Sequence, residues 1–97
     1  MSVPPTFKFR LYVAGDGPNS IQAIDNLRIL CREYLAERHE IEIVDVLTDQ
    51  ARALQDGVMM TPLLVKLSPQ PVRKVIGNLS HRENLLQGLG LPASSPQ

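Results

Sequence analysis

The first half of the chain carries the pattern strand, long helix, strand, and this pattern limits the fold more than any other feature. Residues 7–13 alternate apolar and polar side chains, as a half-buried strand does. Apolar residues then recur every three or four positions, which predicts a helix from a cap at Asn19 or Ser20 to about Glu37, with Ile21, Ile24, Leu27, Cys31, Tyr34 and Leu35 on its buried stripe. Residues 41–47 form a second strand. A helix of this length between two strands predicts a βαβ unit with parallel strands.

The second half consists of shorter segments. A short helix is predicted from about Gln50 to Asp56, capped by Thr48 or Asp49 and ended by Gly57. Two strands, at residues 63–67 and 72–76, flank the turn Ser68-Pro69-Gln70-Pro71 and predict a hairpin. The segment Ser80-His81-Arg82-Glu83 fits a capping box that opens a last helix. The order β-α-β-α-β-β-α predicts an α/β fold of the thioredoxin-like kind, with a βαβ half followed by a ββα half.

A Thr61-Pro62 step stands where the third strand begins. Proline donates no hydrogen bond to a sheet, so it is confined to edges, strand starts and bulges. In thioredoxin-like folds the residue before the third strand is a cis-proline. The sequence therefore predicts that Pro62 is cis.

Length and charge limit the classes of function. The chain has 97 residues, which suits one domain, predicted at residues 7–91 between flexible ends at 1–6 and 92–97. Ten basic and ten acidic side chains cancel, so nothing in the net charge attracts nucleic acid or an anionic membrane. No apolar run approaches the roughly 20 residues of a membrane span, and no signal peptide is evident. We expect a cytoplasmic protein.

The chain lacks the usual residues of thioredoxin chemistry. Redox enzymes of this fold carry a cysteine between the first strand and the first helix, where this chain has Gly15-Asp16-Gly17-Pro18-Asn19. The one cysteine, Cys31, lies on the apolar stripe of the helix and is predicted to be buried. His39 and His81 have no neighbouring ligands at metal-binding spacing. We predict no catalytic residue, cofactor or metal; a redox protein or sensor that uses Cys31 stays open as the alternative.

Three basic residues stand out around the hairpin. Lys66, Arg73 and Lys74 flank two prolines that stiffen the turn. A pre-organised backbone lowers the ordering cost of binding, so this hairpin is a candidate docking surface for an acidic partner. A hairpin that is merely solvated remains the alternative.

Several strings along the chain resemble one known family. They are Leu11-Tyr12-Val13-Ala14-Gly15, Pro18-Asn19-Ser20, Asp45-Val46-Leu47, Thr61-Pro62, Pro71-Val72-Arg73 and Ile76-Gly77-Asn78-Leu79-Ser80, followed by Arg82-Glu83. Together they are similar to KaiB, the small circadian-clock protein of cyanobacteria with homologues in other bacteria. The resemblance extends from about Phe7 to Leu91.

The resemblance implies a non-enzymatic regulator that binds the ring-shaped ATPase KaiC. It also implies a metamorphic protein: a ground state of order βαββααβ, often a tetramer, exchanges with a monomeric thioredoxin-like state that binds. On this basis the candidate partner-binding residues are Lys66, Arg73, Lys74, Asp45 and Asp56, the two aspartates bounding a segment of the docked face. The candidate fold-switch positions are Pro62, Gly77, Gly88 and Gly90.

Three departures from the clock proteins affect the expected partners. Gly90 stands where clock members usually have aspartate, and the acidic tail of clock members is absent from residues 92–97. Glu40 and Glu42 open the second strand, where clock members are neutral or basic. That strand meets KaiA in the resembled complex, so a KaiA partner is not expected. The departures suit a homologue outside the core oscillator, which would work together with its own KaiC-like ATPase in a stress- or redox-linked pathway. Self-association of the ground state, as a dimer or a tetramer, is expected as well.

Overall fold

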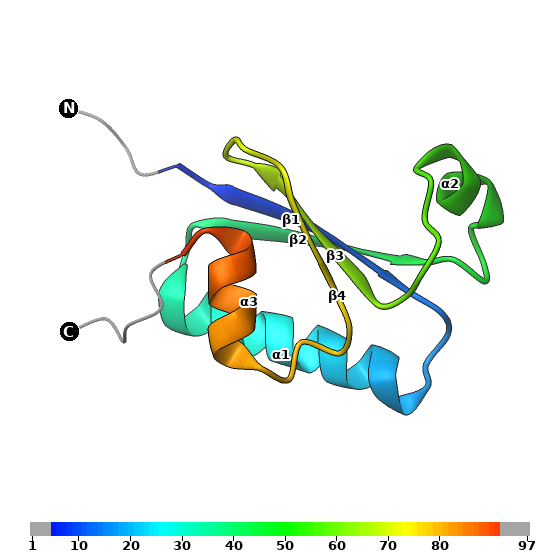
Figure 1. The fold of residues 1–97 in the computed structure, drawn as a ribbon, viewed down its shortest axis with the longest axis horizontal. Helices are drawn as coiled ribbons and strands as arrows, with labels where there is room; N and C mark the ends of the chain where they lie inside the picture. Colours follow the sequence, from blue (N-terminus) through cyan, green and yellow to red (C-terminus); the bar gives the residue numbers. More distant parts are fainter. Residues whose placement is uncertain (1–4, 92–97) are drawn as a thin grey trace.

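The computed structural model describes residues 5–91, so residues 1–4 of the N-terminal end predicted at 1–6, and the whole tail predicted at 92–97, lie outside the described residues. The elements follow one another in the predicted thioredoxin-like order (Figure 1). Their bounds are β1 Phe7–Val13, α1 Pro18–Tyr34, β2 His39–Asp45, α2 Gln50–Gln55, β3 Leu63–Ser68, β4 Arg73–Ile76 and α3 Arg82–Leu89.

The four strands form one mixed sheet in the order β2-β1-β3-β4. Strand β1 pairs in parallel with β2, as the βαβ pattern predicted, and antiparallel with β3. The hairpin partner β4 forms the second edge of the sheet. Strand β2 begins and ends two residues earlier than expected, because its register with β1 pairs Phe7 with His39 and Val13 with Asp45.

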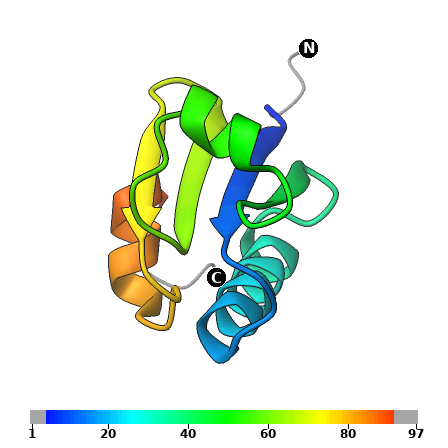
Figure 2. The same ribbon diagram turned by 90° about the vertical axis from the view of Figure 1, so that its right-hand side faces the viewer.

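The helices divide between the two faces of the sheet. Helices α1 and α3 contribute, with the inward side chains of β1, to one large core. Helix α2 stands apart from them, at one end of the opposite face (Figures 1 and 2). Beneath it lies a smaller core formed by Tyr12, Val44, Leu63 and Val65. Because side chains alternate along a strand, β1 serves both cores.

The first helix differs from the prediction at both ends. Its N-cap is Gly17 and Pro18 occupies the first turn, so neither Asn19 nor Ser20 is the cap. Proline suits this position because the N–H it lacks would have no partner in the helix. The helix ends at Tyr34 rather than Glu37. The predicted stripe is also rotated: Ile21 is exposed, while Ala23 and Leu30 are fully buried beside Leu27 and Cys31.

The turns and caps of the second half follow the sequence in part. The Thr61-Pro62 bond is cis as predicted, and Ser68-Pro69 and Gln70-Pro71 are cis as well. Helix α3 is capped by His81 without a side-chain hydrogen bond, so the predicted Ser80 capping box does not form. The Ser80 backbone N–H instead donates to the Asn78 side chain.

The glycines named as fold-switch candidates have distinct local roles. Gly77 and Gly90 have φ angles of 119° and 76°, and Gly90 ends α3 in the left-handed conformation. Gly88 lies inside α3, where a Cβ would stand 2.8 Å from Cγ2 of Val75 on β4. Glycine at position 88 therefore allows α3 to pack closely on the edge strand.

Candidate docking surface

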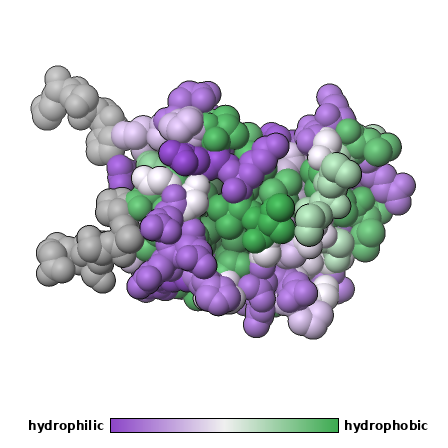
Figure 3. All heavy atoms as spheres, viewed as in Figure 1, coloured by the Kyte–Doolittle hydropathy of each residue, from purple (hydrophilic) through white to green (hydrophobic). Residues whose placement is uncertain are grey.

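Helix α2 presents apolar side chains to solvent instead of burying them. None of its residues is buried, and Leu54 is 84% exposed. The flanking loops add Leu47, Met59 and Met60, of which Met59 is 91% exposed. We call these four residues the α2 surface. Figure 3 shows hydrophobic side chains gathered at the end of the molecule that α2 forms.

A shallow groove runs across this surface. It has a volume of about 390 Å³ and is lined mainly by Val46, Ala53, Leu54, Val58, Met59 and Met60. Exposed apolar side chains are common singly, but several grouped around a groove are typical of an interaction site. Methionine suits such a site because its flexible, polarizable side chain adapts to a partner.

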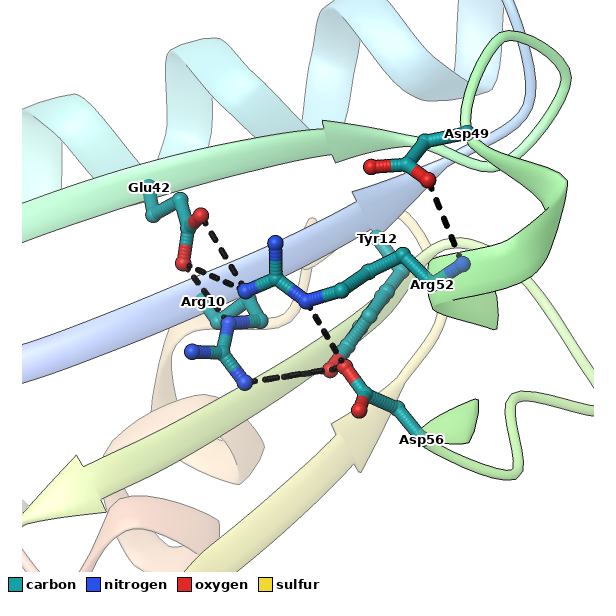
Figure 4. Close-up of polar contacts among 6 residues, drawn as sticks. All are labelled: Arg10, Tyr12, Glu42, Asp49, Arg52 and Asp56. Atoms are coloured by element: carbon teal, nitrogen blue, oxygen red, sulfur yellow. Dashed lines mark hydrogen bonds and ion pairs between the residues drawn. The ribbon is translucent and has the colours of Figure 1, made fainter. Parts of the chain in front are cut away.

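A closed network of opposite charges lies between α2 and the sheet (Figure 4). Arg10 on β1 contacts Glu42 on β2, with Nε 2.7 Å from Oε1, and its Nη1 lies 3.6 Å from Asp56 Oδ2. Arg52 contacts the same two carboxylates, at 3.1 Å from Glu42 and 3.3 Å from Asp56. Tyr12 donates from its hydroxyl to Asp56 Oδ2 at 2.5 Å. We call these five residues the ion-pair network.

The network changes the protonation equilibria of its members. Hydrogen bonds from Arg10 and Arg52 lower the pKa of Glu42. The pKa of Asp56 is lowered by the Tyr12 hydrogen bond and by the charges of Arg52 and Arg10. Burial, with the bond to Asp56, raises the pKa of Tyr12. Both carboxylates are therefore held ionised and Tyr12 is held neutral at ordinary pH.

The two predicted aspartates are engaged within the chain. Asp45 accepts hydrogen bonds from the backbone N–H groups of Gly15 and Leu47, both at 3.0 Å. It thereby joins the loops that follow β1 and β2. Asp56 belongs to the ion-pair network. The structure gives both aspartates an internal role and places the exposed apolar side chains beside them.

The three basic residues of the hairpin do not form one exposed cluster. Arg73 and Lys74 are exposed on β4, but alternation along the strand points them to opposite faces of the sheet. Lys66 is only 4% exposed, and its Nζ lies 5.7 Å from the centre of the Phe7 ring. Burial and the nearby charge of Arg73 lower the pKa of Lys66. The expectation that Lys66 stands on the hairpin surface is therefore wrong.

Comparisons with known proteins agree with the resemblance read from the sequence. The KaiB domain family matches residues 10–91 of the chain. The chain belongs to the KaiB family. It is 42% identical over 86 residues to the circadian clock oscillator protein KaiB of Microcystis aeruginosa. The aligned region covers 89% of this chain and 83% of the relative. It is 40% identical over 82 residues to the circadian clock protein KaiB3 of Synechocystis sp., covering 84% and 80% respectively.

Solved structures confirm the thioredoxin-like fold of this KaiB-family chain. The N-terminal domain of SasA from Synechococcus elongatus superposes with a TM-score of 0.69 at 18% identity, covering 93% of this chain and 89% of that domain. Mitochondrial thioredoxin 3 from Saccharomyces cerevisiae superposes with a TM-score of 0.68 at 17% identity, covering 89% and 78%. At these identities the likeness concerns the fold alone.

The KaiB-family chain shares the thioredoxin fold without an accessible thiol. Cys31 is fully buried in the main core, and this burial raises its pKa to about 12. A thiolate is the reactive form, so a buried neutral thiol is inert. No group of three or more potential ligands is close enough to hold a metal ion within residues 5–91. In that same range no helix has the length and apolar character to cross a bilayer.

Cys31 should react with a thiol reagent only when the chain opens. In native buffer, labelling by Ellman's reagent should be slow and proportional to the small fraction of opened molecules, because the core must open before the reagent reaches Sγ. Adding urea should accelerate it in step with the unfolded fraction. Immediate and complete labelling of the folded protein would instead revive the redox interpretation.

The segment from Asp45 to Asp56, which was predicted as part of the docked face, includes Leu47 and Leu54 of the α2 surface, whereas Met59, Met60 and most of the ion-pair network were not predicted. Leu47 ends the strand predicted at residues 41–47, Leu54 lies in the predicted short helix, and Met59 and Met60 directly precede the Thr61-Pro62 step. An apolar residue that fits no buried stripe is the sequence signal that could have indicated an exposed apolar surface. The Arg10–Glu42 pair could not be found without the register of β1 on β2.

Proposed function

We propose that this chain is a non-enzymatic regulator that docks on a KaiC-like ring-shaped ATPase through the α2 surface. The observation that carries the proposal is that Leu54 and Met59 are exposed beside a groove. Membership of the KaiB family supports the choice of partner. An apolar patch of this kind is costly to leave in water and is buried when a partner binds. The buried thiol of Cys31 argues against a redox function.

The hairpin is proposed to contribute charge rather than the main contact. The turn between β3 and β4 lies at the end of the sheet opposite to α2 (Figure 1). Arg73 and Lys74 therefore stand away from the groove, at a distance where they can guide an acidic partner. Charges at the rim of an interface affect mainly the association rate.

The second half of the chain is proposed to exchange with the βαββααβ arrangement. Its elements are short: α2 has 6 residues, β4 has 4 and α3 has 8. Short helices take their stability from packing, so two packings of one sequence can differ by only a few kcal/mol. Leu79 adds a local cost, since it is buried with a φ of 65°. We also propose that the chain associates with itself, as a dimer or a tetramer, when it adopts the alternative arrangement.

KaiA is not part of the proposed interaction. The edge strand β2 carries Glu40 and Glu42, and Glu42 is already bound by Arg10 and Arg52. A partner that meets this edge would face two carboxylates. We place the chain in a cytoplasmic pathway with its own ATPase, outside the core oscillator.

The proposal is tested by measuring binding of the chain to a KaiC-like ATPase from the same organism. Biolayer interferometry should detect a specific complex, formed by this chain and not by a thioredoxin used as a control of the same fold. The ATPase should be loaded with ATP and with ADP in turn. Absence of binding in every nucleotide state would remove the proposed function.

Charge reversal at Arg73 and Lys74 should slow association without removing the complex. The double change to glutamate is expected to lower the association rate about fivefold at low salt, with little effect on dissociation. Rising ionic strength should reduce the difference from the wild type, because exposed charges are screened. An unchanged association rate at low salt would exclude the hairpin from docking.

A further inference from the structure

The structure leaves α2 with almost no apolar attachment to the rest of the molecule. It has six residues, none of them buried, which is too short for a helix that is stable by itself. Its outward residue Leu54 faces solvent. The charged side chains that turn toward the sheet are those of Arg52 on the helix and Asp56 at its C-cap, and both are half-buried. Polar contacts must therefore hold much of this helix in place.

These contacts form a closed set in which every charge touches two opposite charges. Arg10 and Arg52 each contact both Glu42 and Asp56. Arg52 approaches both oxygens of Glu42 from one nitrogen, at 3.1 and 3.2 Å. Networks of this kind stabilise more than isolated surface pairs, since each side chain is ordered by several neighbours at once.

The network joins three elements that are distant in sequence. Arg10 and Tyr12 are two residues apart on β1 and therefore share one face of the sheet. Arg10 is paired in register with Glu42 on β2, and all three side chains point to the face that carries α2 (Figure 4). The sheet thus supplies a rigid platform of one cation, one anion and one hydroxyl. Arg52 on the helix and Asp56 at its C-cap, four residues apart, meet that platform together.

We propose that the ion-pair network positions α2 for docking, with Arg10, Tyr12, Glu42, Arg52 and Asp56 as positioning residues that fix the α2 surface on the sheet. This proposal rests on the proposed function. When the network is intact, Leu54 and the groove are held in one arrangement before the partner arrives. When one charge is lost, α2 loosens while the main core, which shares none of these residues, stays folded.

Hydrogen exchange tests the positioning without any partner. The variant Glu42→Gln should speed exchange of the Ala53 and Asp56 amides about tenfold, because loss of the charge permits local opening of α2. These amides donate to the Asp49 and Arg52 carbonyls at 3.2 and 2.9 Å. Amides of β1 should be unaffected. Glu40→Gln is the matched control, since Glu40 is an exposed carboxylate two residues earlier on the same strand and face.

Salt and a second substitution sharpen the test. High salt should speed α2 exchange in the wild type toward the Glu42→Gln rate, and should change that variant little. Tyr12→Phe keeps the ring in the small core and removes only the hydroxyl bond to Asp56. It should also speed exchange in α2. Unchanged exchange in both Glu42→Gln and Tyr12→Phe would overturn the proposal.

Binding kinetics test whether the positioning matters for docking. With an ATPase that binds the wild type, Glu42→Gln should weaken affinity about fivefold through a lower population of the competent arrangement, and Glu40→Gln should not. Faster exchange with unchanged affinity would show that α2 position is irrelevant to docking and overturn the proposal. If the wild type itself binds no ATPase, the proposed function and its docking role fail together, while the exchange result still decides whether the network holds α2.

Discussion

Replacing Leu54 and Met59 with glutamate should abolish binding to the KaiC-like ATPase, with a loss of affinity of at least about a hundredfold. Both side chains are almost fully exposed in the free protein, so the change costs the isolated chain little. In the complex, however, each glutamate would place an unpaired charge in an apolar contact. Buried anchors of an interface commonly cost more than about 2 kcal/mol each when lost.

The matched control is Ile21→Glu, which exchanges an exposed apolar residue of α1 for the same acid. This variant should bind as the wild type does. Circular dichroism and urea denaturation should show that both variants are folded. Retention of near wild-type affinity by the Leu54→Glu, Met59→Glu protein would exclude the α2 surface as the docking site.

The effect of Gly88→Ala on stability should reverse its sign when Val75 is shortened. In the wild-type background the new Cβ would approach Val75 Cγ2 to 2.8 Å, and a β-branched strand residue cannot turn away easily. Overpacking of this kind costs about 1–3 kcal/mol, against a gain of about 1 kcal/mol in helix propensity. In a Val75→Ala background the clash is absent, so the same change should be stabilising.

Urea denaturation of the four proteins in this cycle measures the coupling free energy, expected at about 2 kcal/mol. The contact exists only when α3 packs on β4, so the cycle also reports on that packing. A coupling free energy near zero would show that α3 can shift on the sheet at no cost. In the fold-switching proposal, the same substitution should raise the population of the alternative arrangement.

The βαβ half and the order of all seven elements could be predicted from the sequence, because each long element has its own period. The alternation in β1 and the three-to-four spacing in α1 are local patterns that depend on few distant contacts. The cis bond at Pro62 could also be predicted, since a proline within a sheet is confined to edge strands, strand starts and bulges, and thioredoxin-like folds have a cis-proline at this strand start. The burial of Cys31 followed from its place on the helix stripe.

Helix caps were predicted less well, because several residues near each end could serve. Gly17, Asn19 and Ser20 all suit the start of α1, and Pro18 decides among them by occupying the first turn. At α3, Asn78 takes the Ser80 N–H and His81 becomes the cap. Both outcomes depend on how the preceding loop packs.

The sequence by itself determined the fold class, the family and the absence of a thiol at the thioredoxin position. Only the tertiary structure decided which charges are free: it buries Lys66 against Phe7, separates Arg73 from Lys74, and joins Arg10 to Arg52 through two carboxylates. Periodicity states which face a side chain takes within one element, whereas the neighbours of a charge are set by strand register and by where a helix lies on a sheet. For this reason the sequence could indicate the segment from Asp45 to Asp56 as part of the docked face, but the exposure of its apolar side chains and the ion-pair network that positions them emerged only from the folded chain.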